Sequence, residues 1–237
     1  MKPFQFKYFT LYQEHAAMKV STDSLILSGF VHKHVQEAHH ILDIGSGSGV
    51  LAFLLAQKFT HAQIDGVEID AHALKDALKT LDQPFFHNKQ IKFHHADISS
   101  YNSTTRFDLI VSNPPYFIDS TKNNNPLETQ ARHTDSLHPI ALFQAIKTHL
   151  QENGTAWVIY PIEFEMPFEQ AASEQQLFIQ KSIIVNGKKE KPVRKVTCFV
   201  HEHPQNLVST SFLIRSEDGS YTDEYKTLTK EFHNKSL

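Results

Sequence analysis

Short apolar runs alternate along the chain with longer segments in which apolar residues recur every three or four positions. The runs predict buried strands, and the longer period predicts amphipathic helices. The expected strands lie at 41–44, 63–68, 90–95, 107–112 and 155–160, and the helices between them at 50–59, 71–81 and 136–150. Alternating strands and helices indicate an α/β, Rossmann-like fold, with a mostly parallel sheet and helices on both faces.

The alternation stops near residue 175, after a helix expected at 167–175. Three strand-like runs then follow one another, with turns at Asn186-Gly187 and Pro204-Gln205, before a short helix at 222–232. These runs span 177–185, 193–202 and 207–215. Strands without helices between them are expected to pair antiparallel, so antiparallel strands should form one edge of the sheet.

The first 40 residues precede the first clear strand and open with six large apolar side chains that must pack on the rest of the molecule. These are Phe4, Phe6, Tyr8, Phe9, Leu11 and Tyr12. A helix should follow, capped by Thr22 or Asp23 and buried along Leu25, Ile26 and Phe30. We expect one globular domain, in which an extension at 1–40 packs on a core at 41–237.

Composition narrows the classes of protein. The chain has 237 residues, of which 40% are hydrophobic and 21% charged, as in soluble globular domains. No apolar run approaches the roughly 20 residues that span a bilayer, and no signal-peptide core is visible, which predicts a cytoplasmic protein. One cysteine and sixteen scattered histidines without metal-ligand spacing predict no metal site. No obligatory protein partner is indicated.

The formal net charge of −3 means that any nucleic-acid partner must bind a local basic patch. The best candidate is the loop after Asn186, where five cations accompany Glu190. They are Lys188, Lys189, Lys191, Arg194 and Lys195. This loop can contact phosphates, or it can be a solvated hairpin tip that protects the edge of the sheet. The second interpretation is slightly favoured.

A glycine-rich loop follows the first strand of the alternating region. Asp43 and the glycines form the pattern D-x-G-x-G-x-G with Gly45, Gly47 and Gly49, directly before a helix. Glycines there let backbone N–H groups approach a ligand at a helix N-terminus. The spacing differs from the dinucleotide fingerprint and is typical of S-adenosylmethionine-dependent methyltransferases.

Two carboxylates extend this cofactor hypothesis. Glu68 ends the second strand, where an acid accepts hydrogen bonds from both hydroxyls of a ribose. Asp97 follows the third strand and can accept from an adenine amine, although capping its own loop is nearly as plausible. Asp70 is interpreted as the N-cap of the next helix.

The most informative stretch follows the fourth strand and reads Asn113-Pro114-Pro115-Tyr116-Phe117. The amide oxygen of Asn113 and the carbonyl oxygen of Pro114 can both accept from one planar NH₂ group, while Tyr116 and Phe117 can stack on the ring that carries it. Alone, the motif is equally compatible with a turn. Its position at a strand end beside the glycine loop favours methylation of an amine.

A polar loop at 117–139 lacks apolar periodicity, and long loops of this kind at ligand-binding ends are often functional. Arg132 and His133 within it can hold a phosphate or shape a base pocket, or they can be solvated surface residues.

Nearly the whole chain resembles the bacterial adenine N6-methyltransferases that modify the adenine beside the anticodon of valine tRNA. The resemblance rests on the segment 7–27, the glycine loop, the Asn113 motif, the run 131–133 and the tail 218–225; the region 164–181 matches weakly. It implies a class I methyltransferase with S-adenosylmethionine as cofactor and tRNA as substrate. It also implies that Lys19 and Thr22 contact the cofactor, and that Phe117, Arg132 and His133 contact the substrate.

The expected reaction is methyl transfer to the N6 of adenine, with Asn113, Pro114 and Tyr116 as catalytic residues. Enzymes that methylate a glutamine N5 in release factors use the same motif, but they carry a helical N-terminal domain that 40 residues cannot form. Methyltransferases for adenine in another RNA or in DNA stay open as alternatives, although those for DNA usually add a recognition domain. A non-catalytic binding module is disfavoured by the intact motifs.

Overall fold

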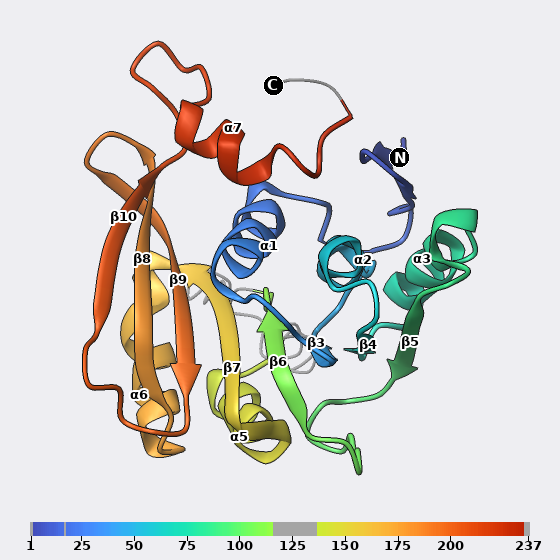
Figure 1. Ribbon diagram of the computed structural model, residues 1–237, viewed down its shortest axis with the longest axis horizontal. Helices are drawn as coiled ribbons and strands as arrows, with labels where there is room; N and C mark the ends of the chain where they lie inside the picture. Colours follow the sequence, from blue (N-terminus) through green and yellow to red (C-terminus); the bar gives the residue numbers. More distant parts are fainter. Residues whose placement is uncertain (1, 17, 116–136, 235–237) are drawn as a thin grey trace, which may run out of the picture.

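The computed structural model of the chain describes residues 2–16, 18–115 and 137–234. In this part of the chain an eight-stranded sheet forms the centre, with the strand order β10-β8-β9-β7-β6-β3-β4-β5 (Figure 1). Its strands are β3 (His40–Ile44), β4 (Gln63–Glu68), β5 (Gln90–His95), β6 (Phe107–Ser112), β7 (Leu150–Pro161), β8 (Phe178–Lys188), β9 (Lys191–Val200) and β10 (Val208–Leu213). The helices are α1 (Thr22–His34), α2 (Val50–Lys58), α3 (Ala71–Leu81), α5 (Pro139–His149), α6 (Glu165–Glu174) and α7 (Asp223–Thr229), with 3₁₀ turns η1 (Pro84–Phe86) and η2 (Ile162–Phe164).

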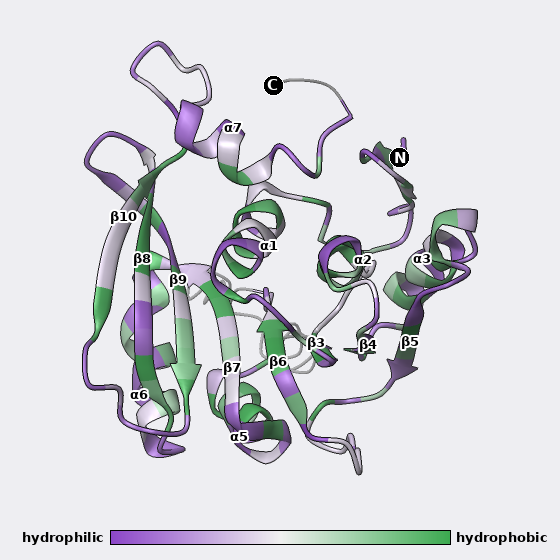
Figure 2. Ribbon diagram, in the orientation of Figure 1, coloured by the Kyte–Doolittle hydropathy of each residue, from purple (hydrophilic) through white to green (hydrophobic). Residues whose placement is uncertain are grey.

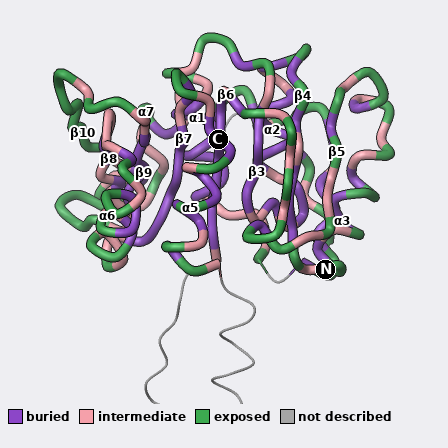
Figure 3. The backbone as a smooth tube through the Cα atoms, turned by 90° about the horizontal axis from the view of Figure 1, so that it is seen from below, coloured by how far each residue is buried: buried purple, intermediate pink, exposed green. Residues whose placement is uncertain are grey.

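The predicted parallel region is confirmed. Strands β5, β4, β3, β6 and β7 pair in parallel in that order, and β3 lies at the centre with Ile41 beside Ile64 and Leu109. Separate apolar clusters cover the two faces, one built with α1 and α2 and the other with α5 and α6. Buried residues follow β3, β6 and β7 (Figure 3), and hydrophobic residues concentrate on the strands rather than in the loops that join them (Figure 2).

The antiparallel edge is confirmed for two of its three strands. Strand β9 lies between β7 and β8 and runs antiparallel to both. Strand β10 instead pairs in parallel with β8, with Val208 beside Lys181, so the expected antiparallel pairing of this strand is wrong. Since both sides of β9 are occupied, β10 adds to the free side of β8. It runs opposite to β9 and therefore in the direction of β8.

The β8–β9 turn lies further along the chain than predicted. Asn186 still pairs with Pro192, and the turn falls between Lys188 and Lys191, where Glu190 has a φ of +53°. The basic loop is also smaller than expected. Arg194 and Lys195 lie on β9 and are paired with carboxylates, so the exposed tip carries only Lys188, Lys189, Glu190 and Lys191.

The N-cap of helix α1 lies one residue before the first of the two predicted caps. Ser21 is the N-cap, and its side chain accepts from the backbone N–H of Asp23, so neither Thr22 nor Asp23 caps the helix. The expected stripe is buried, but so is the whole run from Asp23 to Val31, because α1 contacts β7, α2 and α7. A Cβ at Gly29 would come within 2.6 Å of the Leu228 side chain, so glycine permits the close contact with α7.

The N-terminal segment packs on the core through several of its large apolar side chains, whereas Tyr8 is 50% exposed. It forms a small sheet of β1 (Phe4–Gln5) and β2 (Thr10–Leu11), and Phe6, Phe9 and Leu11 are buried in the cluster shared with α1 and α2. The ring of Phe9 lies 5.7 Å from that of Phe53 and 5.1 Å from that of Phe86. The division at residue 40 stays a prediction. Within the described residues, no helix has the length and apolarity needed to span a membrane.

Candidate active site

The ends of two neighbouring strands bring the predicted motifs together. Ile44 pairs with Ser112 in the register of β3 and β6, and the Ser112 hydroxyl donates to the Ile44 carbonyl at 2.8 Å. The glycine loop and Asn113 therefore leave the sheet side by side. A cavity of about 480 Å³ opens here, within the size range of small-molecule sites. Its lining includes the predicted residues Lys19, Gly45, Gly47, Glu68 and Asn113.

The glycines of the loop adopt backbone conformations that other residues avoid. Their φ angles are +69° at Gly45, +56° at Gly47 and +82° at Gly49. A Cβ would meet no atom within 4 Å at Gly45 or Gly47, whereas at Gly49 it would lie 2.6 Å from the Phe53 ring. The first two glycines thus leave backbone open to the cavity, and the third lets α2 pack against aromatic rings.

Asp43 does not line the cavity, but its side chain links the strand before the glycine loop to the helix after it. Gly49 is the N-cap of α2 and has no side chain to offer, so Asp43 Oδ2 accepts from the backbone N–H of Ala52 at 3.2 Å. The carboxyl group is fully buried, and Oδ1 has no hydrogen-bond partner in the described chain. Burial, aided by the charge of Glu68, raises the pKa of Asp43 to about 7.

Glu68 joins the glycine loop to the end of β4. Its Oε2 accepts from the backbone N–H of Gly47 at 2.7 Å, and its Oε1 accepts from that of Asp70 at 2.8 Å. Each carboxylate oxygen retains acceptor capacity for a further donor. Asp70 is the N-cap of α3, as predicted, and accepts from the backbone N–H of His72.

Asp97 lies outside the cavity lining. Its carboxylate is exposed, and Oδ1 accepts from both the backbone N–H and the hydroxyl of Ser99 at 2.8 Å. These bonds fit the loop-capping interpretation, and an adenine contact by Asp97 stays a prediction. His95, which the sequence did not single out for this role, lines the cavity at the end of β5.

The N-terminal segment forms one wall of the cavity. Lys19 lines it, but the ammonium group is turned to backbone and donates to the Gln13 carbonyl at 2.8 Å. The segment is fixed to α3 by Asp76, whose Oδ2 accepts from the backbone N–H groups of His15 and Ala16. Thr22 is half-buried and outside the lining, so its cofactor contact stays a prediction.

Sequence reasoning missed Asp76 and several lining residues, among them Ala16, Met18, Ser24 and Ile69. Only Asp76 carries a signal of its own. In the helical pattern of α3 it falls on the same face as Ala73, Ala77 and Thr80, and a carboxylate on a buried face needs partners.

Asn113 directly follows the last residue of β6, and 8% of its surface is exposed. Its side-chain Nδ2 donates to the hydroxyl oxygen of Ser24 at 3.2 Å. Pro114 is buried, and Pro115 lines the cavity. The predicted stacking and substrate residues Tyr116, Phe117, Arg132 and His133 lie outside the described residues.

Comparison with known proteins gives consistent relationships. A family model described as "Methyltransferase small domain" matches residues 16–175. A "tRNA1(Val) (adenine(37)-N6)-methyltransferase" from Pedobacter heparinus is 36% identical over 235 residues, covering 97% of each chain. One of the same name from Trichodesmium erythraeum is 35% identical over 236 residues and covers 98% of each chain.

Solved structures support the fold. A predicted O-methyltransferase from Agrobacterium tumefaciens superposes with a TM-score of 0.70 at 14% identity, covering 91% of this chain and 98% of that one. A ribosomal protein L11 methylase from Lactobacillus delbrueckii subsp. bulgaricus gives a TM-score of 0.58 at 17% identity, with coverages of 81% and 84%. The Rossmann-like methyltransferase fold predicted from the sequence is confirmed.

Proposed function

The chain belongs to the tRNA1(Val) (adenine(37)-N6)-methyltransferase family, and we propose that it transfers a methyl group from S-adenosylmethionine to the exocyclic N6 of an adenine in tRNA. One observation carries the proposal. The glycine loop, Glu68 and Asn113 line a single cavity, so groups suited to a cofactor and a group suited to an amine meet there.

The cavity fits S-adenosylmethionine. Open space beside Gly45 and Gly47 would let the cofactor approach the backbone, and Glu68 would hold the ribose hydroxyls with a carboxylate that its bonds to Gly47 and Asp70 keep in place. Asp43 would contribute indirectly by holding the loop on α2. Bound S-adenosylmethionine supplies an electrophilic methyl group.

Asn113 and Pro114 would prepare the amine. The N6 of adenine is a poor nucleophile because its lone pair is delocalised into the purine. Two acceptors, Asn113 Oδ1 and the Pro114 carbonyl, would bind its two protons, favour a pyramidal nitrogen and aim the lone pair into the cavity. No strong base is needed, since the proton becomes acidic once the nitrogen is alkylated. Tyr116 would stack on the base, an interaction worth about 1–3 kcal/mol.

The choice of adenine over glutamine rests on the relatives. A glutamine amide presents the same planar NH₂ to Asn113, and the cavity alone does not separate the two substrates. The matched relatives named for adenine(37) of tRNA1(Val) cover 97% and 98% of the chain. We therefore place the adenine of that tRNA first. An enzyme acting on tRNA would work in the cytoplasm.

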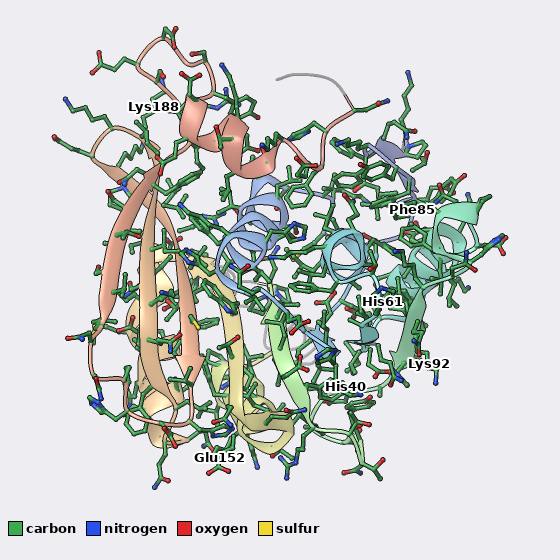
Figure 4. All side chains as sticks on the ribbon, in the orientation of Figure 1. His40, His61, Phe85, Lys92, Glu152 and Lys188 are labelled. Carbon is green, nitrogen blue, oxygen red and sulfur yellow. The ribbon has the colours of Figure 1, made fainter. Side chains whose placement is uncertain are left out.

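The basic hairpin tip offers a surface for the tRNA. Val158 of β7 pairs with Ser112 of β6 on one side and with Thr197 of β9 on the other, so Ser112 and Thr197 lie at the same height in the sheet. Lys191 precedes Thr197 by six residues on β9. At about 3.3 Å per residue, the tip extends roughly 20 Å beyond the level of Ser112, on the side of Asn113. Figure 4 shows Lys188 at this tip and Lys92 on the opposite part of the molecule. Among described residues, no carboxylate pairs with Lys188, Lys189 or Lys191.

The test is incubation with labelled S-adenosylmethionine and one acceptor at a time, using tRNA from cells that lack the enzyme, release factor or DNA. We expect label in tRNA as N6-methyladenosine, at the adenine beside the anticodon of valine tRNA. Asn113→Ala should abolish turnover while cofactor binding stays nearly intact. Label in release factor alone, or wild-type turnover by Asn113→Ala, would contradict the proposal.

A further inference from the structure

Two buried polar side chains meet at the cavity from distant parts of the chain. Ser24 lies in the first turn of α1, and Asn113 follows β6. Asn113 Nδ2 lies 3.2 Å from Ser24 Oγ, and the exposed fractions are 3% for Ser24 and 8% for Asn113. Both residues line the cavity. Their contact is therefore part of the candidate site and is shielded from competing water.

The two ends of an asparagine amide have the same shape and opposite chemistry. Oδ1 accepts hydrogen bonds, whereas Nδ2 donates them. If Nδ2 faced the amine of the substrate, donor would meet donor and the amine protons would lose an acceptor. In the observed contact the Ser24 hydroxyl accepts from Nδ2, and this arrangement leaves Oδ1 to face the substrate.

We propose that Ser24 is a positioning residue for methyl transfer, which holds the Asn113 amide so that Oδ1 is presented to the substrate amine. The inference rests on the proposed role of Asn113. Ser24 acts through Asn113.

The first turn of α1 is well anchored for this task. The neighbouring Asp23 accepts from Arg194 Nε of β9 at 2.8 Å, and Ser21 caps the helix. Position 24 is thus fixed relative to the sheet that carries Asn113. A positioning group needs this support, because small displacements of a catalytic group reduce rates strongly.

The same helix supplies a matched control. Ser28 lies one turn after Ser24, is fully buried, and has a hydroxyl without a hydrogen-bond partner among the described residues. Ser24→Ala and Ser28→Ala remove the same atom from the same helix at similar burial. Only the first removes a bond to Asn113.

Steady-state kinetics with unmodified tRNA and calorimetry with S-adenosylmethionine test the proposal. For Ser24→Ala we expect kcat to fall about 10- to 100-fold, with cofactor affinity within twofold of wild type. Ser24→Thr keeps the hydroxyl and should recover most of the rate, and Ser28→Ala should match wild type. An unchanged kcat in Ser24→Ala, or equal losses in Ser24→Ala and Ser28→Ala, would overturn the inference.

A second measurement needs no tRNA. The side-chain ¹⁵N amide signal of Asn113, identified by its loss in Asn113→Ala, should shift in Ser24→Ala and not in Ser28→Ala. If Ser24→Ala does not fold, Ser24→Cys replaces it as a variant of similar size with a weak acceptor. A wild-type enzyme inactive on tRNA would refute the proposed function, while an unmoved Asn113 signal would refute the contact with Ser24.

Discussion

Arg194 Nε lies 2.8 Å from Asp23 Oδ2, and this ion pair joins β9 to the first turn of α1. Only 10% of the Asp23 side chain and 28% of the Arg194 side chain are exposed. The pair therefore lies in a partly desolvated site, between the antiparallel edge of the sheet and the wall of the cavity.

Removing this guanidinium should destabilise the protein. For Arg194→Met we expect the free energy of unfolding to fall by about 1–3 kcal/mol, because a nearly buried carboxylate loses a charge-assisted hydrogen bond. Urea unfolding measures the loss. Lys191→Met, at an exposed position of the same strand, is the control and should change stability by less than about 0.5 kcal/mol. Equal effects of the two variants would show that the pair contributes nothing specific.

Glu68 should be essential for cofactor binding. In Glu68→Gln an NH₂ group replaces one carboxylate oxygen and must face the backbone N–H of either Gly47 or Asp70. We expect the dissociation constant of S-adenosylmethionine to rise at least tenfold, equivalent to about 1.4 kcal/mol. Calorimetry on the free enzyme tests this expectation. Asp97→Asn, outside the cavity lining, should have a smaller effect; a larger one would establish Asp97 as the main acceptor.

The buried carboxyl of Asp43 predicts a pH dependence of stability. Its pKa is about 7 in the fold against an ordinary value of 3.8. Between pH 3.8 and about 7, Asp43 is ionised in the unfolded chain but still protonated in the folded protein. Asp43 therefore lowers the free energy of unfolding more and more as the pH rises through this interval. Above that interval the penalty is fully present.

Asp43→Asn removes this penalty and keeps an oxygen for the Ala52 N–H. The gain in Tm over wild type should therefore be larger at about pH 8 than at about pH 5. Thermal unfolding at both pH values, with the exposed Asp97→Asn as control, measures the difference. A gain that is equal at both pH values, or larger in acid, would show that Asp43 does not titrate as described.

The lysine tip should affect tRNA binding without affecting chemistry. Replacing Lys188, Lys189 and Lys191 by Gln should raise KM for tRNA about tenfold. In a plot of log KM against log salt concentration, the slope should decrease by roughly 0.7–0.9 for each phosphate contact that is lost. The kcat value and cofactor affinity should stay near wild type. The control replaces Lys89, Lys92 and Lys147, near the amino ends of strands β5 and β7, where no effect is expected. Equal salt slopes for both triple variants would exclude the tip from the interface.

Much of the fold and of the cofactor half of the site followed from the sequence, because the relevant signals are local. Glycine spacing, the apolar strands and Asn113 each report a structure made by neighbouring residues. Lys195 shows the opposite case. It resembles a surface lysine in the sequence, yet it is buried and bound to Glu165 and Glu169 of α6. The parallel pairing of β10 and the contact of Ser24 with Asn113 also depend on which distant segments meet, and local patterns do not encode that.

The close contact between Gly29 and Leu228 makes helix α1 dependent on a segment that follows the whole central sheet in the sequence. Helix α1 forms part of the cavity wall, but it is enclosed only when α7 and the ring of Phe232, 5.1 Å from that of His32, have packed on it. Without that segment, buried apolar side chains of α1 would be exposed beside the candidate cofactor site. The order of the cavity wall therefore depends on a contact that is made outside the cavity.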